Sequence, residues 1–105
     1  MKPLFIPLKT EFFEAFANGT KDTEYRRYGP RWNERTCAIG REVVLSHGYG
    51  KKRRLSAVVV AHEAVYAAFL PVDVLSAWVK CYGEPKGVAS CIRVVLMGPN
   101  VKCPS

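Results

Sequence analysis

The stretch from Leu55 to about Ala67 restricts the fold of this chain more than any other segment. It contains three consecutive valines, Val58 to Val60, and follows a run of four basic residues. β-branched residues favour strands, and a continuous apolar run is typical of a strand covered on both faces. We therefore expect one long strand, covered on both sides, around which the other segments are arranged.

Shorter strands and one helix are predicted before this segment, and a final strand after it. The strands are expected at Leu4 to Leu8, Thr23 to Tyr28, Arg41 to Ser46 and Val88 to Met97. The first helix should begin after Thr10, acting as its N-cap, and end at Asn18-Gly19, where glycine suits the left-handed position beyond a helix. Residues 31–39 are predicted to form an irregular loop.

A second helix is predicted between Pro71 and Gly83. Five residues in this stretch fall on one helical face: Val74, Leu75, Trp78, Cys81 and Tyr82. Proline suits a helix start, and Gly83 marks the end. Trp78 is expected in the core.

The predicted element order is β-α-β-β-β-α-β in a single domain over residues 1–105. Turns rather than crossover helices join most of the strands, which indicates a mainly antiparallel sheet. A short chain protects its sheet edges by rolling the sheet up. The expected fold class is therefore α+β, a small mainly antiparallel β-barrel with two helices.

Basic residues are concentrated in one segment. From Lys21 to Arg54 the chain has ten basic and four acidic residues, a net charge of +6 out of +7 for the whole sequence. Aromatic rings lie among them: Tyr25, Tyr28, Trp32 and Tyr49. Basic groups contact phosphate and rings stack on bases, so this mixture is typical of surfaces that bind single-stranded RNA. A solvated basic surface with partly buried rings would have the same composition.

The candidates for nucleic-acid contact combine loop arginines, one tryptophan and the four-base run: Arg27, Arg31, Trp32, Lys51, Lys52, Arg53 and Arg54. Trp32 is either a stacking platform on the loop or a lid packed on the barrel. A lysine or arginine run supplies phosphate contacts whose strength falls with salt. RNA, a nucleoside or a nucleotide is the expected partner.

The cysteines and histidines do not form a metal motif. The four cysteines, Cys37, Cys81, Cys91 and Cys103, lack the short gaps of a zinc knuckle, and no histidine completes one. We expect neither a metal nor a cofactor.

Residues 1–9 form a short segment interrupted by two prolines, unlike an export or membrane-spanning segment. We therefore expect reduced thiols, a cytoplasmic location and no membrane partner.

The segment Gly19–Arg26 carries the most specific chemistry. Glu24 and Arg26 are two residues apart and share one face of a strand. Lys21 would face away in a straight strand, but a lysine still in the turn after Gly19 can swing to the same side. Two cations and one carboxylate would then meet at the mouth of the barrel. The alternative is a structural ion-pair cluster beside a turn.

The pattern Gly-x-Lys-x-x-Glu-x-Arg after a short helix, present as Gly19, Lys21, Glu24 and Arg26, resembles the motif of the ASCH domain family. That family has a fold similar to the PUA barrel, and the element order extends the resemblance over nearly the whole chain. The resemblance implies a cleft between barrel and helices that takes RNA or a nucleoside. Some relatives hydrolyse the acetyl amide of N4-acetylcytidine, and others are ribonucleases.

The chain departs from the amidohydrolase branch at one position. That branch has a threonine three residues after the motif lysine, where this chain has Glu24, and it uses a glutamate near its second helix. Asp73 and Glu63 are the acids in that region, and neither is a clear match. The departure favours RNA or nucleotide binding, with possible RNA processing, over deacetylation of a nucleoside.

Three functions therefore stay open. The first is an RNA- or nucleotide-binding module, the second a hydrolase acting on RNA or an acetylated nucleoside, and the third a non-catalytic adaptor with a basic surface. For the hydrolase the catalytic candidates are Lys21, Glu24 and Arg26, because a desolvated lysine becomes nucleophilic and a carboxylate with a raised pKa acts as a base.

The remaining acid–base candidates are His47, His62 and Glu63. The last two are adjacent in a predicted strand and point to opposite faces, so they cannot form a dyad with each other. A histidine in a strand is more often packed or hydrogen-bonded than catalytic, and the sequence assigns no role to these three.

Overall fold

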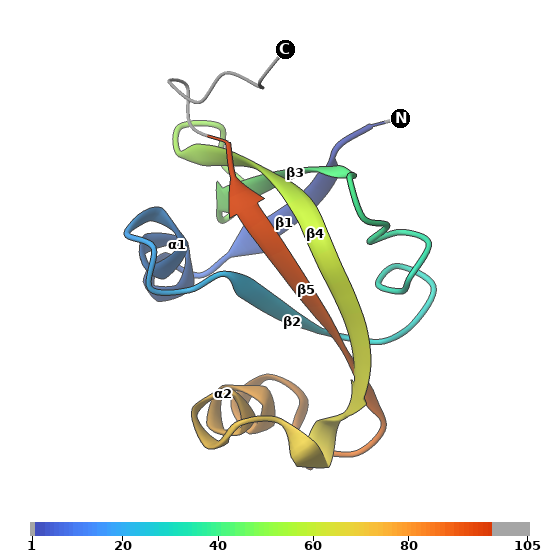
Figure 1. The fold of residues 1–105 in the computed structure, drawn as a ribbon. Helices are drawn as coiled ribbons and strands as arrows, with labels where there is room; N and C mark the ends of the chain where they lie inside the picture. Colours follow the sequence, from blue (N-terminus) through green and yellow to red (C-terminus); the bar gives the residue numbers. More distant parts are fainter. Residues whose placement is uncertain (1, 98–105) are drawn as a thin grey trace.

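The structure of this protein is a computed structural model that describes residues 2–97 (Figure 1). The predicted closing turn at Gly98-Pro99 and Cys103 lie outside these residues. The elements are β1 (Leu4–Leu8), α1 (Thr10–Ala17), β2 (Thr23–Arg27), β3 (Glu42–His47), β4 (Arg54–Tyr66), the 3-10 turn η1 (Ala67–Phe69), α2 (Val72–Tyr82) and β5 (Val88–Leu96). This order confirms the predicted β-α-β-β-β-α-β arrangement.

The five strands form one curled sheet in the order β1-β3-β4-β5-β2. β1 and β3 run parallel, and the other three pairs are antiparallel. The sheet curls into a half-barrel whose two edge strands are β1 and β2 (Figure 1). The predicted fold class, a small α+β and mainly antiparallel barrel, is confirmed. The seam between the edge strands is where the candidate site lies.

β4 is the long strand that the valine run predicts, but only one of its faces is covered along the run. Val59 is buried, whereas the side chain of Val60 is 38% exposed. The register shifts between Val59 and Ala61, which is a β-bulge. The prediction that both faces are covered is wrong here, because α2 packs against the later part of β4 and leaves the outer face of the run in solvent.

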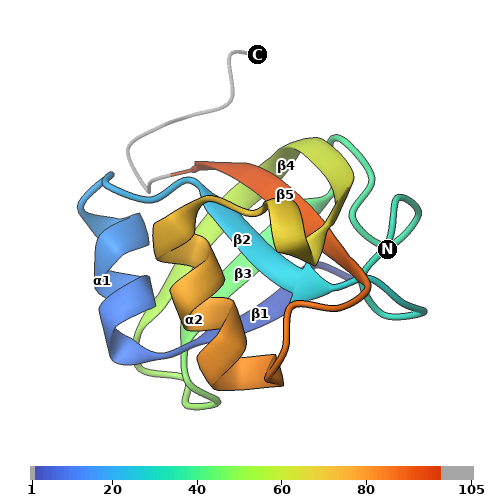
Figure 2. The ribbon, with the colours of Figure 1, turned by 90° about the horizontal axis from the view of Figure 1, so that it is seen from below.

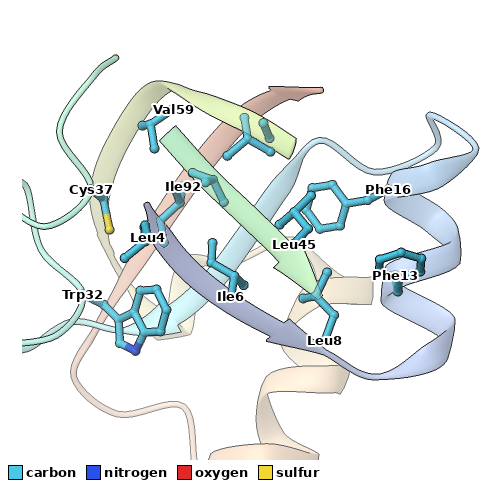
Figure 3. Packing of buried hydrophobic residues seen from close by; sticks show 13 residues of the cluster. Leu4, Ile6, Leu8, Phe13, Phe16, Trp32, Cys37, Leu45, Val59 and Ile92 are labelled. Carbon is cyan, nitrogen blue, oxygen red and sulfur yellow. The ribbon is translucent and has the colours of Figure 1, made fainter. Parts of the chain in front are cut away.

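The barrel core is built from alternating residues of the strands and from two phenylalanines of α1 (Figure 3). In β1 the residues Leu4, Ile6 and Leu8 point inward and are buried. Phe13 and Phe16 of α1 close one side of this core. Burial of each such side chain contributes about 1.5–3 kcal/mol, so α1 is fixed to the barrel by hydrophobic packing.

The loop between β2 and β3 places Trp32 as a lid on the barrel. The tryptophan is 9% exposed and belongs to the core (Figure 3). Its main-chain carbonyl accepts a 2.8 Å hydrogen bond from the buried Ser90 hydroxyl. Of the two alternatives for this ring, the structure gives the packed lid. Because the Trp32 ring is buried, it has no exposed face on which a nucleic-acid base could stack, as the sequence had suggested.

α2 packs on the outer face of the sheet around a second cluster. Trp78 is 3% exposed and lies with Ala67, Leu70 and Ala89, as predicted for a core residue. Neither helix in the described part of the chain has the length and apolar character needed to span a bilayer.

Candidate functional site

The turn after α1 aims Lys21 at the inner face of β2. Gly19 has φ +84, the left-handed conformation predicted for it. The next two amide groups, of Thr20 and Lys21, both donate to the carbonyl oxygen of Ala15, at 3.0 and 3.1 Å. The chain therefore folds back under the end of the helix before β2 begins.

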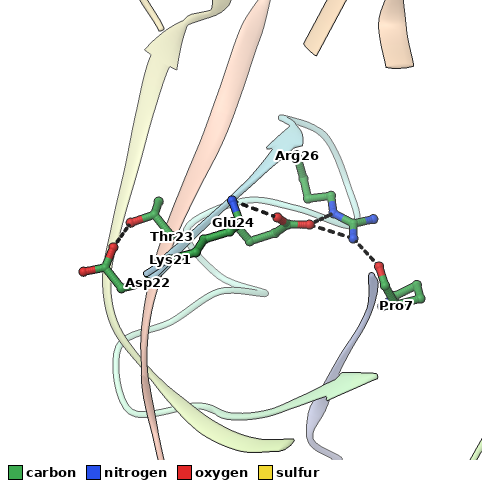
Figure 4. A network of polar contacts seen from close by, with 6 residues as sticks. All are labelled: Pro7, Lys21, Asp22, Thr23, Glu24 and Arg26. Atoms are coloured by element: carbon green, nitrogen blue, oxygen red, sulfur yellow. Dashed lines mark hydrogen bonds and ion pairs between the residues drawn. The ribbon is translucent and has the colours of Figure 1, made fainter. Parts of the chain in front are cut away.

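Lys21, Glu24 and Arg26 converge as predicted (Figure 4). The Nζ of Lys21 lies 3.7 Å from Oε1 of Glu24. Arg26 donates to Oε2 of the same carboxylate from Nε at 2.9 Å and Nη2 at 2.8 Å. The carboxylate side chain is only 10% exposed. A buried carboxylate with two cationic partners is satisfied and held in a fixed orientation.

Arg26 also reaches across the seam of the barrel. Its Nη2 donates to the main-chain carbonyl oxygen of Pro7 in β1, at 2.6 Å. The guanidinium lies 5.0 Å from the centre of the Trp32 ring. Most of the hydrogen-bonding capacity of Arg26 is therefore used inside the protein, whereas Lys21, whose side chain is equally exposed, makes a longer contact to Glu24.

A cleft of about 610 Å³ opens beside this cluster. Its lining residues come from α1 and α2 and from β1 and β2. Figure 2 shows how these two helices lie next to each other over the strands. Aromatic side chains form much of its wall: Phe12, Tyr25, Trp78 and Tyr82. This size and mixture of rings with a few charged groups is typical of a site for a small molecule or for one unit of a polymer.

The charged groups that line the cleft do not reproduce the basic character of the whole chain. Three are basic and four are acidic: Lys9, Lys21, Arg26, Glu11, Asp22, Glu24 and Asp73. The positive excess of +7 therefore lies outside the cleft.

Lys21 sits in an environment that changes its acidity. Its Nζ lies 5.4, 5.4 and 5.0 Å from the ring centres of Phe12, Phe16 and Tyr25. Burial lowers the pKa of the ammonium group below its ordinary value of 10.5, and the charge of Glu24 opposes this effect. The neutral amine is therefore easier to form here than on an exposed lysine.

Asp73 of α2 lines the same cleft as Lys21. Its charge acts on the Lys21 ammonium and raises that pKa slightly. The other acid of this region, Glu63, is exposed on the outer face of β4 and does not line the cleft. The structure therefore brings only one of the two acids to the site.

The two histidines serve packing and hydrogen bonding outside the cleft. The Nε2 of His47 lies 2.7 Å from the hydroxyl oxygen of Thr10. The prediction of Thr10 as N-cap is wrong, because Lys9 occupies that position without a side-chain cap and the hydroxyl turns to His47. The Nε2 of His62 lies 3.0 Å from the hydroxyl oxygen of Ser90.

The other predicted nucleic-acid contacts lie outside the cleft. The guanidinium of Arg27 is 4.8 Å from the ring centre of Tyr82, at the rim, and that of Arg31 is 5.3 Å from the ring centre of Trp32. Residues 51–53 lie in the turn between β3 and β4, Arg54 begins β4, and none of the four lines the cleft. Among residues 2–97 no three His, Cys, Asp or Glu side chains are grouped as they would be to hold a metal ion.

Comparisons with known proteins place this fold. No family model and no curated protein matches the sequence. The hypothetical protein PH0355 has a similar structure, with a TM-score of 0.66 and 15% identity over 89% of this chain and 97% of that chain. A mutant of ZmASCH from Zymomonas mobilis is also similar, with a TM-score of 0.60 and 17% identity over 92% of this chain and 76% of that chain.

The chain has an ASCH-like fold. This confirms the resemblance at the level of the fold, since identities this low say nothing about activity. In this ASCH-like fold Lys21, Glu24 and Arg26 line the cleft between barrel and helices.

The resemblance predicts a cleft between barrel and helices, but the sequence did not identify which helix residues line it, and Asp73 was only a weak match there. Phe12, Asp73 and Cys81 all line it, yet they are separated from the motif or from one another by long stretches of chain. The stripe of α2 predicted a buried face, and Cys81 belongs to that stripe, but the residue is exposed at the cleft. No local pattern distinguishes a helix residue at a cleft from one in a core.

Proposed function

We propose that this chain binds RNA or a nucleotide by taking one base or nucleoside into the cleft. The observation that carries the proposal is the carboxylate of Glu24, buried at the aromatic-walled cleft and fixed by Lys21 and Arg26. Oε2 is used by Arg26, whereas Oε1 has only the longer contact to Lys21. A carboxylate accepts several hydrogen bonds, so Oε1 is available to an amino or imino group of a base.

The balance of charges favours a base over a phosphate as the group inside. Four acidic and three basic side chains line the cleft. A phosphate would be repelled by the acids, whereas a neutral ring with amino and carbonyl groups finds both acceptors and donors.

The test is calorimetric titration of cytidine, the other nucleosides and their monophosphates into wild type and Glu24→Gln. Loss of a charged hydrogen bond costs about 1.5–3 kcal/mol, so we expect Glu24→Gln to weaken binding about tenfold or more. The matched control is Glu42→Gln, an exposed residue of β3 away from the cleft. Equal affinities of Glu24→Gln and wild type, or no binding of any nucleoside, would contradict the proposal.

Hydrolysis of an acetylated nucleoside such as N4-acetylcytidine is the second candidate. The observation in its favour is that Asp73 and Lys21 line one cleft. With the pKa of Lys21 lowered by burial, the neutral amine is accessible as a base or nucleophile. A carboxyl group within the same cleft is suited to transfer a proton to the departing amine.

A further inference from the structure

The turn between β3 and β4 combines an exposed ring with the densest positive charge of the chain. Tyr49 is 79% exposed, and its ring centre lies 6.1 Å from that of Phe5. The guanidinium of Arg54 lies 5.3 Å from the Phe5 ring centre. The tyrosine is thus supported on one side by a second ring, which is itself in contact with a cation.

The four bases of this turn have different roles. Arg53 is bound to Glu14 of α1 at 2.6 Å, and Arg54 donates from Nε to the carbonyl oxygen of Gly50 at 3.3 Å. Lys51 and Lys52 are exposed, and neither forms an ion pair within the part of the chain that the structure describes. The arginines therefore anchor the turn, whereas the two lysines are available to an external anion.

We infer that this turn is a second RNA-contacting surface, on which a base of a single strand stacks on Tyr49 while Lys51 and Lys52 contact the neighbouring phosphates. The inference rests on the proposed function and adds a surface to it. The acid-rich cleft is unsuited to phosphate, and the turn supplies the positive charge that the cleft lacks. Stacking on an exposed ring beside basic groups is how single strands are bound without sequence preference.

A second exposed aromatic pair serves as a comparison for the turn between β3 and β4, because it lacks the unpaired basic residues of that turn. Tyr66 and Phe69, at the end of β4, are 65% and 79% exposed, with ring centres 6.2 Å apart. The loop before β5 is held near the end of β4, since the amide of Ala67 donates to the carbonyl oxygen of Gly87. Its lysine, Lys86, is paired with Glu84 at 3.0 Å. This pair offers rings without an unpaired basic run, so it is a matched control.

The experiment measures fluorescence anisotropy of a labelled single-stranded RNA of about 12 nucleotides, a length within the range that one such site covers. Tyr49→Ala should weaken binding about tenfold, and Tyr49→Phe should retain it, because the ring rather than the hydroxyl stacks. Tyr66→Ala should leave the affinity unchanged. Both positions are exposed, and thermal melting checks that each of the three variants folds.

The double variant Lys51→Gln/Lys52→Gln tests the phosphate contacts. The fall of log affinity with log salt should become less steep by about 1.4, because the variant loses two phosphate contacts and each contributes about 0.7 to the slope for a single strand. An unchanged slope, or an equal loss with Tyr49→Ala and Tyr66→Ala, would overturn the inference. Binding of nucleosides without binding of the RNA would overturn it and leave the cleft proposal standing. RNA binding that depends on Tyr49, in a protein that binds no nucleoside, would support this inference and contradict the proposal that the cleft binds a nucleoside.

Discussion

The guanidinium of Arg26 hydrogen-bonds to the main-chain carbonyl oxygen of Pro7 at 2.6 Å, and so joins the two edge strands of the sheet. β2 carries the arginine and β1 carries the proline, and these strands are not paired with each other. The same guanidinium holds Glu24 (Figure 4). Closure of the barrel seam and orientation of the carboxylate therefore depend on one side chain.

Arg26→Lys should destabilise the fold and leave Glu24 less well held. A lysine keeps the charge but cannot donate to the carboxylate and the carbonyl in the same fixed plane. Hydrogen bonds to charged groups contribute about 1.5–3 kcal/mol, and we expect the free energy of unfolding to fall by about 2 kcal/mol in urea denaturation. Arg27→Lys, at an exposed residue of the same strand, is the control and should have little effect. A fall no larger than that of the control would contradict the bridging role.

Lys21→Arg separates binding from catalysis. A lysine that only contributes charge is partly replaceable by arginine, whereas arginine stays protonated and cannot act as a base or nucleophile. If the chain only binds, affinity for nucleosides should be largely kept. If it hydrolyses N4-acetylcytidine or a short RNA, turnover should collapse while binding survives. Wild type is assayed first on both substrates, and no turnover of either would remove the hydrolase candidate.

The stability of the fold should depend on pH through Lys21. Burial holds the pKa of this group in the folded chain below the unfolded value of 10.5. In the window between these two pKa values the unfolded chain binds more protons at this site, so the contribution of Lys21 to the free energy of unfolding rises with pH. The measurement is urea denaturation of wild type and Lys21→Met from neutral pH to pH 10.5. Wild type should gain stability relative to the variant, and a constant difference would contradict the lowered pKa.

Cys81 should report occupation of the cleft. It is exposed there, whereas burial raises the pKa of Cys91 to about 11 and also raises that of Cys37. The thiolate is the reactive form, so iodoacetamide at mildly alkaline pH should modify Cys81 well before the other two. A bound nucleoside should slow this modification, as measured by peptide mass spectrometry. Equal rates with and without a nucleoside that binds would place the ligand elsewhere.

The motif cluster was predictable because its geometry is local. Strand residues two apart share a face whatever the sheet does next, which fixes Glu24 beside Arg26. Gly19 allows the left-handed turn that brings Lys21 to the same side. The order of strands and helices was likewise readable from periodicity, turns and the glycines that end the helices, each of which depends on a few neighbouring residues.

Three other outcomes depended on tertiary packing. Trp32 could have been a platform or a lid, and its packing with the buried residues of the barrel core made it a lid. The basic turn after β3 lies away from the cleft because α1, and not the turn, borders that space. The far wall, including Asp73 and Cys81, exists because α2 packs through Trp78 on the outer face of the sheet. Contacts between residues so distant in sequence follow from how whole surfaces fit, which no local pattern specifies.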